Sequence, residues 1–196
     1  MRIGAQVQAL PRQADLNFPS PEPLTAAHFS AVLALTRAFE AETGRLDRDR
    51  LARWTDAAFL ALAVNGGQDG FVIALDQDCT LYDSPNFHWF RARLTNFVYI
   101  DRIIVAPRFQ GHGLAQALYG AVLARMERTG HSLLACEVNL VPPNARSHAF
   151  HGRMGFAQLG EGHPYGDSRK VAYLIRRAGS PADPGAPTPR LQASEQ

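Results

Sequence analysis

The sequence is poor in several residues and patterns that mark common protein classes. Its two cysteines, Cys79 and Cys136, are isolated and form no C-x-x-C pair, so the sequence indicates neither a disulfide framework nor a zinc site. Of its 20 lysine and arginine residues only Lys170 is a lysine, and the net charge of +2 does not favour a nucleic-acid partner. The sequence therefore gives no support for a metal or a nucleic acid as ligand.

Long apolar segments are also absent. The longest purely apolar run, Ala57–Val64, is far shorter than the ~20 residues that a membrane helix needs. The first residues lack the basic segment and the following apolar core of about 7–15 residues that typify a secretory signal peptide. We therefore expect no membrane association and a cytoplasmic location.

The remaining pattern predicts one mixed α/β domain with irregular ends. A chain of 196 residues, 46% of them hydrophobic, is large enough to bury one core. Residues 1–24 contain several prolines and are predicted to be irregular, with a first strand within residues 1–10. Residues 25–177 form the predicted domain. Residues 178–196 are rich in Ala, Pro, Gly and Ser and are predicted to be a disordered tail.

Hydrophobic periodicity predicts the elements that open the domain. Helical spacing of apolar residues indicates a helix over residues 25–43 and another over 47–55. Two strand-like runs, residues 57–64 and 70–75, flank Asn65-Gly66-Gly67 and are predicted to form a hairpin.

The strand predicted over Phe97–Val105 and its neighbour Ser132–Asn139 carry two candidate carboxylates. Because side chains alternate along a strand, the predicted neighbour places Glu137 and Asn139 on one face. Between the two strands, Asp101 and Glu137 are the available acids. The same alternation divides the first strand into one face with Phe97, Tyr99, Asp101, Ile103 and Val105 and another with Val98, Ile100, Arg102 and Ile104.

A glycine-rich stretch, Arg108–Ala115, follows the first of these strands and opens a long amphipathic segment. Gly111 and Gly113 lack a Cβ, so a phosphate can approach their backbone closely. The start of the following helix leaves N–H groups free, and its dipole favours negative charge. The P-loop lysine and hydroxyl residue are missing, and Gln116 stands where the dinucleotide fingerprint has Gly or Ala. The stretch predicts a site for another phosphate-bearing ligand.

A second stretch, Asn144–Phe156, predicts a short helix between two strands. Two prolines stop the preceding strand, Asn144 is a favourable N-cap, and Gly155 suits a left-handed helix stop. Ser147 and His151 are four residues apart and therefore share one helix face.

Both stretches resemble signatures of the GNAT superfamily of N-acetyltransferases. Arg108–Ala115 is similar to the acetyl-CoA pyrophosphate loop R/Q-x-x-G-x-G/A, and Asn144–Phe156 is similar to N-x-x-S-x-x-F-Y-x-x-x-G-F. The resemblance covers roughly Phe59 to Arg177 and extends to a little-characterised group of predicted bacterial acetyltransferases. It implies a GNAT-like α/β fold, with a central, mostly antiparallel mixed sheet whose central strands are splayed and flanked by helices.

The resemblance also implies acetyl-CoA as the acyl-donor co-substrate, with no metal. The strand residues near 103–105 would hold the pantetheine and polarise the thioester, and the glycine-rich stretch would hold the pyrophosphate. The second helix would face the cofactor from the other side. The implied cofactor-binding residues are Ile103, Ile104, Val105, Arg108, Gln110, Gly111, His112, Gly113, Leu114, Ala115, Asn144, Ser147, Phe150 and His151.

Amine acetylation requires a base, because the amine arrives protonated. Glu137 and Asp101 are the two candidates, with Tyr99 close to where many family members place the base. The alternative is that Asp101 pairs with a neighbouring arginine and that Glu137 only orders its strand.

His151 occupies the position at which the family usually has a tyrosine that protonates the leaving thiolate. It is a candidate for this role, either as an imidazolium or through one N–H of a neutral ring. The alternative is that it only packs against the cofactor while Tyr173 or a water supplies the proton. His148 and His151 have no further ligand nearby in the sequence, so no metal site is predicted.

The sequence thus predicts an N-acetyltransferase that moves an acetyl group to the primary amine of a small molecule by direct attack on the thioester. Two alternatives are a protein N-terminal or lysine acetyltransferase and a non-catalytic acyl-CoA-binding or sensing domain. The aromatic segment Tyr82–Phe90 either lines the acceptor pocket or fills the core. The expected partners are acetyl-CoA and an amine acceptor, and a homodimer is left open.

Overall fold

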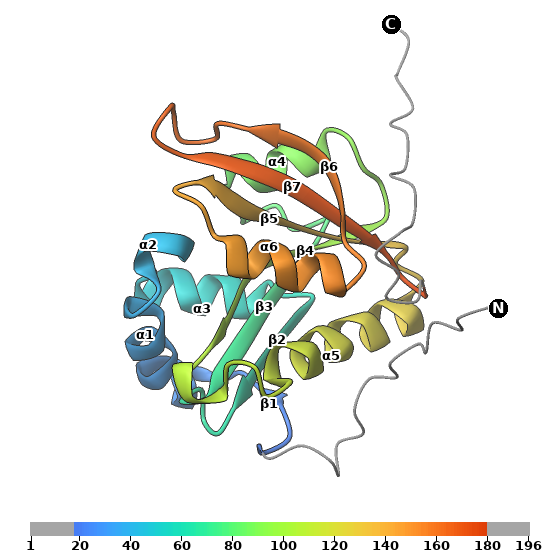
Figure 1. Cartoon of the computed structure of the whole chain (residues 1–196). Coiled ribbons are helices and arrows are strands. Elements are labelled where there is room, and N and C mark those ends of the chain that lie inside the picture. The colour runs from blue at the N-terminus through green and yellow to red at the C-terminus, as the bar shows by residue number, and fades with distance from the viewer. Residues whose placement is uncertain (1–17, 180–196) are drawn as a thin grey trace, which may run out of the picture.

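A single seven-stranded sheet organises the protein, for which a computed structural model describes residues 18–179. Its strand order is β1-β2-β3-β4-β5-β7-β6, and within the described residues the pair β4–β5 is parallel while the other pairs are antiparallel. The strands are β1 (Glu22–Pro23), β2 (Leu60–Val64), β3 (Gly70–Asp76), β4 (Phe97–Val105), β5 (Leu133–Val141), β6 (Ala157–Gly162) and β7 (Lys170–Arg177) (Figure 1).

The sheet confirms the predicted GNAT-like fold class, including the hairpin of β2 and β3. The strand predicted within residues 1–10 and positions 180–196 of the predicted tail lie outside the described residues. Within the predicted irregular segment, β1 pairs with the edge of β2 through two residues. An edge strand of this kind accepts Pro23, because the missing N–H is not needed by a further strand.

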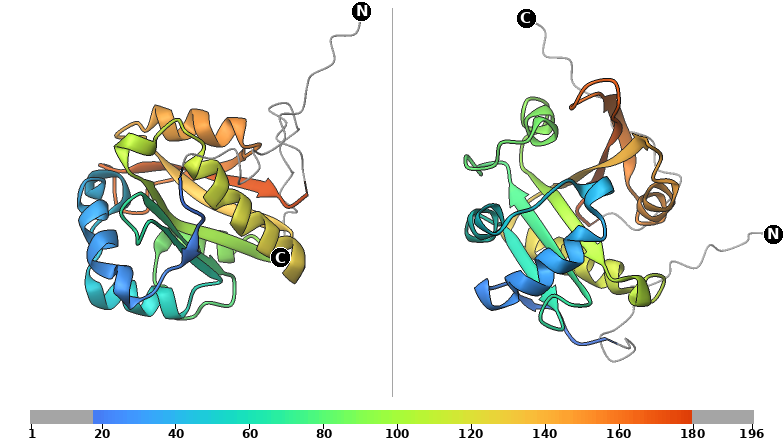
Figure 2. Two further views of the ribbon diagram at one scale, coloured as in Figure 1. Left: turned by 90° about the horizontal axis from the view of Figure 1, so that it is seen from below. Right: turned by 90° about the vertical axis from the view of Figure 1, so that its left-hand side faces the viewer.

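Helices cover both faces of the sheet. On one face, α5 and α6 pack over the central strands around Leu118 and Met154; on the other face, α1 and α3 pack around Val32 and Leu51, and α4 packs around Phe87. Figure 2 shows these layers from two sides. The helical elements are η2 (Ala26–His28), α1 (Phe29–Arg37), α2 (Glu40–Thr43), α3 (Arg48–Asp56), α4 (Pro85–Arg91), η3 (Pro107–Phe109), α5 (Leu114–Thr129) and α6 (Ala145–Arg153).

The helix predicted over residues 25–43 is interrupted. α1 ends at Arg37, and Phe39 leaves helical geometry with φ −125° and ψ 19° before α2 begins. The Thr36 hydroxyl donates to the Val32 carbonyl at 2.8 Å, and such contacts favour bending of a helix. The change of direction brings Phe39 and α2 to the wall of a cavity between the central strands.

β4 bulges at Asp101, which the predicted alternation of faces did not anticipate. Two consecutive residues of β3 pair with Arg102 and Ile100, so Asp101 has no residue opposite. A bulge shifts the alternation by one residue, and downstream of it Ile103 and Val105 pack against the same core as Ile100. The predicted division of faces is therefore wrong beyond Ile100.

The parallel pair β4–β5 separates after three paired positions. Pairing runs from Phe97 with Leu133 to Tyr99 with Ala135 and then stops, although both strands continue. The right-hand view of Figure 2 shows the two halves of the sheet diverging beyond this point. The predicted splaying of the central strands is confirmed, and it leaves the facing edges of β4 and β5 without a strand partner.

The aromatic core beneath α4 is expected to be a main source of stability. Phe87 is fully buried and packs against Phe97 and Tyr99. Phe87→Ala should lower the free energy of unfolding by about 3–5 kcal/mol, because it removes buried surface and leaves a cavity. Denaturant unfolding measures this loss. Leu81→Ala, at a side chain 65% exposed, is the control and should change stability by no more than about 0.5 kcal/mol; equal losses would contradict the packing described.

Candidate active site

The separation of β4 and β5 opens a cavity of about 1110 Å³. Its walls come from β4, β5, the start of α5 and one face of α6, together with α2, α3 and the segment 81–86. Segments far apart in the sequence therefore meet around the gap in the sheet. Within residues 18–179 there is no group of three or more His, Cys, Asp or Glu side chains that could hold a metal ion, and no helix has the length and apolarity to cross a membrane.

Most of the predicted cofactor-binding residues line this cavity. Arg108 and His112 do not line it. The predicted residues that the cavity brings together are Ile103, Ile104, Val105, Gln110, Gly111, Gly113, Leu114, Ala115, Asn144, Ser147, Phe150 and His151.

The glycine-rich turn has the geometry of an anion site. Gly111 and Gly113 have φ of 83° and 87°, in the left-handed region that favours glycine. A Cβ built on Gly111 would have no neighbouring atom within 4 Å, so this backbone is open to a ligand. α5 starts directly after Gly113, and its first N–H groups have no partner within the helix. With the dipole of this long helix, they can bind a phosphate group.

Arg108 has a partner within the protein. Its guanidinium forms an ion pair with Asp69, whose side chain is 4% exposed, while the Arg108 side chain is 59% exposed. A buried carboxylate requires a partner, so Arg108 compensates Asp69 at the start of β3. His112 contacts the Gln110 carbonyl oxygen through Nδ1 at 3.1 Å.

α6 presents Ser147 and His151 to the cavity, as their spacing predicts. The Asn144 side chain accepts the Ser147 backbone N–H at 3.0 Å and caps the helix. His151 Nδ1 lies 2.7 Å from the Ser147 carbonyl oxygen, which can only accept, so Nδ1 carries the proton. Nε2 then accepts the Tyr119 hydroxyl at 2.7 Å. Burial lowers the pKa of His151 to about 4, so the ring is neutral at pH 7.

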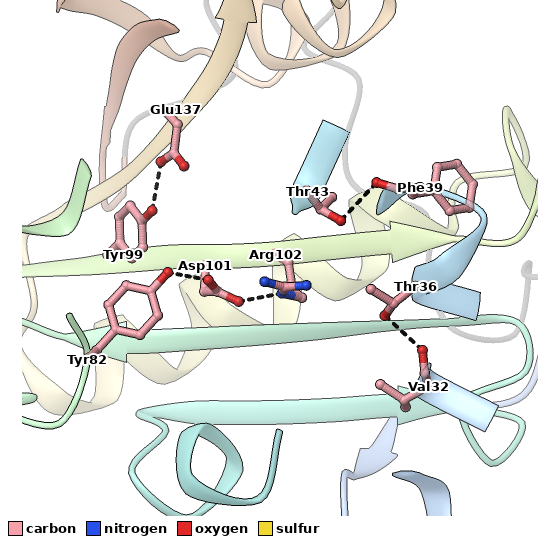
Figure 3. A network of polar contacts seen from close by, with 9 residues as sticks. All are labelled: Val32, Thr36, Phe39, Thr43, Tyr82, Tyr99, Asp101, Arg102 and Glu137. Atoms are coloured by element: carbon pink, nitrogen blue, oxygen red, sulfur yellow. Dashed lines mark hydrogen bonds and ion pairs between the residues drawn. The ribbon is translucent and has the colours of Figure 1, made fainter. Parts of the chain in front are cut away.

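Glu137 projects from β5 into the cavity and is held by two neutral donors. The Tyr99 hydroxyl donates to Oε2 at 2.8 Å (Figure 3), and the Asn86 amide donates to Oε1, also at 2.8 Å. Burial raises the pKa of Glu137 to about 7, and the charge of Asp101 adds to the rise, while the hydrogen bonds from Tyr99 and Asn86 oppose it. The carboxyl group can thus take up and release a proton near neutral pH.

Asp101, the other candidate base, has both oxygens engaged. Tyr82 donates its hydroxyl to Oδ1, and Arg102 donates Nε–H to Oδ2 at 2.6 Å. Figure 3 shows Tyr82, Asp101 and Arg102 in a row along β4. This is the pairing with a neighbouring arginine that the sequence left open. Glu137, by contrast, is held by two neutral hydrogen-bond donors.

The aromatic segment 82–90 contributes both to the cavity wall and to the core. Tyr82 and Asn86 line the cavity, whereas Phe87 and Phe90 are fully buried in the core. Tyr119 has the spacing of an ordinary core residue on α5, so no local sequence signal marks its contact with His151. Arg102 did carry a signal, since it is an arginine within a run of Ile and Val.

Comparisons with known proteins agree with this architecture. The chain is similar in structure to a ribosomal-protein-alanine N-acetyltransferase from Brucella melitensis (18% identity, TM-score 0.58, covering 80% of this chain and 96% of that one). It is also similar to Ard1 from Thermoplasma volcanium (16%, 0.62, 81% and 97%) and to the NatC complex bound to Gag peptide and CoA (18%, 0.58, 80% and 96%). At these identities the likeness shows the fold alone.

Sequence comparison identifies the family. No curated protein matches the chain. Residues 31–156, more than half of the chain, match the acetyltransferase (GNAT) family. The two signatures, the separated central strands and this match together show that the protein belongs to the GNAT family of acetyltransferases.

Proposed function

We propose that the protein transfers the acetyl group of acetyl-CoA to the primary amine of a small molecule, by direct attack of the amine on the thioester. The observation that carries the proposal is the placement of Glu137, a carboxyl group with a pKa of about 7, in the same cavity as the glycine-rich turn that starts α5. A base and an anion site in one cavity are what an acetyl-CoA-dependent transferase requires.

The cofactor would bind along the gap in the sheet. Its pyrophosphate would lie against Gly111, Gly113 and the first turn of α5, and its pantetheine would run along Ile103–Val105, where β4 has no strand partner on its β5 side. Backbone N–H groups on that edge would donate to the thioester carbonyl oxygen as charge develops on it. Preorganised donors of this type are worth roughly 3 kcal/mol each in the transition state.

Glu137 would act as the general base. It takes a proton from the substrate ammonium, and the freed amine attacks the thioester carbonyl carbon. The tetrahedral intermediate then loses the second proton from its nitrogen to water and collapses, the C–S bond breaks, and a neutral amide and the thiolate of CoA are released. Uptake of one proton by the thiolate completes the reaction.

His151 would contact the cofactor arm rather than protonate the thiolate from its ring. In the neutral ring the single N–H is used by the Ser147 carbonyl, and Nε2 accepts from Tyr119. Tyr173, the other proton donor considered, is not part of the cavity wall, and its ring stacks on Trp89. A water is therefore the proposed proton source for the thiolate.

The function is tested by thiol release from acetyl-CoA. The purified protein is mixed with acetyl-CoA and a panel of small amines, peptides with free N-termini and lysine-containing peptides, and free thiol is measured. Stimulation by small amines is the expected result. Stimulation by peptides alone would establish a protein acetyltransferase instead, and binding of acetyl-CoA without stimulation by any arm would indicate a non-catalytic sensor.

The anion site is tested with a matched pair of glycines. Gly111→Val should weaken acetyl-CoA binding at least about tenfold, because a branched side chain would enter the phosphate position and favour a different backbone. Gly130, at the other end of α5, also has a positive φ of 76° and open space around it, but it does not line the cavity. Gly130→Val should cost similar stability and leave affinity unchanged. Calorimetric titration measures both, and equal affinities in the two variants would disprove the site.

The base is tested by pH dependence. Glu137 must be deprotonated to act, so kcat/KM should rise with pH, tenfold per unit below pH 7, and level off above the pKa of about 7. Glu137→Gln should lower kcat by about 10²–10⁴-fold and remove this inflection. A variant with wild-type activity would refute the assignment.

Stability provides the control for this variant. Because the folded pKa of Glu137 lies above its ordinary value of 4.5, the stabilisation from its protonated form is complete below pH 4.5 and is lost as pH rises through 7. Glu137→Gln does not ionise, so its stability relative to the wild type should increase between pH 5 and pH 8. Loss of activity together with this gain separates catalysis from misfolding.

A further inference from the structure

A buried guanidinium stands in the cavity wall beside α3. The Arg102 side chain is only 3% exposed, and the guanidinium lies 5.2 Å from the ring centroid of Trp54 on α3. Its Nε donates to Asp101, whose other oxygen accepts from Tyr82. Groups from α3, β4 and the segment before α4 thus fix the orientation of this one side chain, and Figure 3 shows Asp101 and Tyr82 among them.

The guanidinium keeps unused donors. Its Nη1 is buried and has no hydrogen-bond partner in the described part of the chain. A buried charged donor without a partner is costly, and native structures rarely keep one without a reason. The planar fork of arginine matches a carboxylate, which can accept two parallel N–H bonds. A carboxylate in the cavity next to Arg102 would supply the missing partner.

A buried acceptor without a hydrogen-bond partner lies beside Glu137. The Asn86 amide donates to Glu137 through its nitrogen, which leaves Oδ1 buried and without a partner. With Glu137 ionised, the reverse orientation of the amide would place its oxygen against the carboxylate, so the amide nitrogen is the donor in this state. Asn86 Oδ1 and the Glu137 carboxylate are both acceptors, and together they suit an ammonium group, which has three N–H bonds to donate.

The mouth of the cavity on this side is basic. Arg45, Arg50 and Arg53, on and before α3, are exposed and line it, as does Arg169. Glu42 and Asp83 are the acidic residues among the exposed wall positions there. A positively charged surface attracts anionic molecules and disfavours polycationic amines.

We infer that the acceptor, on the proposed acetyltransferase function, is a small amine that also carries a carboxylate, such as a free amino acid. Arg102 binds the carboxylate and determines specificity, while Glu137 and Asn86 receive the ammonium group. The two ends of such a zwitterion satisfy the unpartnered donor and the unpartnered acceptor of the same cavity. A peptide N-terminus carries no carboxylate next to its amine and does not satisfy the donor.

The wild-type enzyme tests this with paired substrates. Thiol release from acetyl-CoA is measured with a series of amino acids and with the amide of each, which keeps the amine and removes the negative charge. A charged hydrogen-bonded partner predicts a kcat/KM about 10- to 150-fold higher for the acids. Equal values for acids and amides would overturn the inference and leave the proposed function intact. Higher values for a phosphorylated amine than for the acids would also overturn it, in favour of a phosphate.

Two substitutions of Arg102 test whether this residue causes the preference for acids over amides. Arg102→Gln should bring the acid-to-amide ratio close to one, mainly through KM for the acids, and Arg102→Lys should restore only part of it because the ammonium lacks the planar fork. Arg48→Gln is the matched control, since Arg48 also lies over an aromatic ring, Phe29 at 5.5 Å, but does not line the cavity. It should keep the wild-type ratio.

Three further results would decide between the inference and its alternatives. A folded Arg102→Gln variant that keeps the wild-type ratio would overturn the role of Arg102. If this variant does not fold, the wild-type ratio and the partial recovery by Arg102→Lys decide instead. If acetyl-CoA binds but no small amine of either series stimulates thiol release, the proposed function fails and the inference fails with it.

Discussion

The separation of β4 from β5 is the constraint on which the rest of the structure depends. Two parallel strands that begin with three paired positions and then diverge leave their facing backbone edges without a strand partner in the middle of a sheet, where a neighbouring strand would ordinarily pair with them. The bulge at Asp101 lies just beyond the last pair and increases the local twist of β4. The fold therefore places two backbone edges without a strand partner along a cavity, and on the proposed function the cofactor would take the place of the missing strand.

The polar groups around this gap are arranged in two separate networks. Tyr99 and Asn86 hold Glu137 through neutral hydrogen bonds, whereas Tyr82 and Arg102 hold Asp101 with one neutral and one charged partner. Burial raises the pKa values of both tyrosines well above 10, so they remain protonated donors throughout the physiological range. Hydrogen bonds of this kind fix side chains in place. Among the described members of these two networks, Arg102 Nη1 and Asn86 Oδ1 are buried atoms without a hydrogen-bond partner, and both residues line the cavity.

Local signals in the sequence predict those parts of the molecule that depend on neighbouring residues. The hairpin of β2 and β3, the cap at Asn144 and the glycine turn before α5 each follow from a few adjacent residues, and the structure contains all three. The partner of Arg108 lies 39 positions away at Asp69, and the position of Asp101 depends on the register between β3 and β4. Neither is encoded in a local pattern, because pairing across a sheet is decided by the packing of the whole domain.

The two carboxylates of the cavity have different environments. Asp101 is paired with Arg102, whereas Glu137 accepts from the neutral donors Tyr99 and Asn86. An arginine with no counter-charge near Glu137 would lower the pKa of its carboxyl group and make it a weak base at neutral pH. Asp101 prevents this, since it neutralises Arg102 through a direct ion pair and its own charge raises the pKa of Glu137. The same pair keeps the guanidinium fork in the cavity wall without committing its remaining donors. On the proposed function, Asp101 is a positioning residue: it holds Arg102, which would bind the anion of the substrate, while Glu137 would exchange a proton.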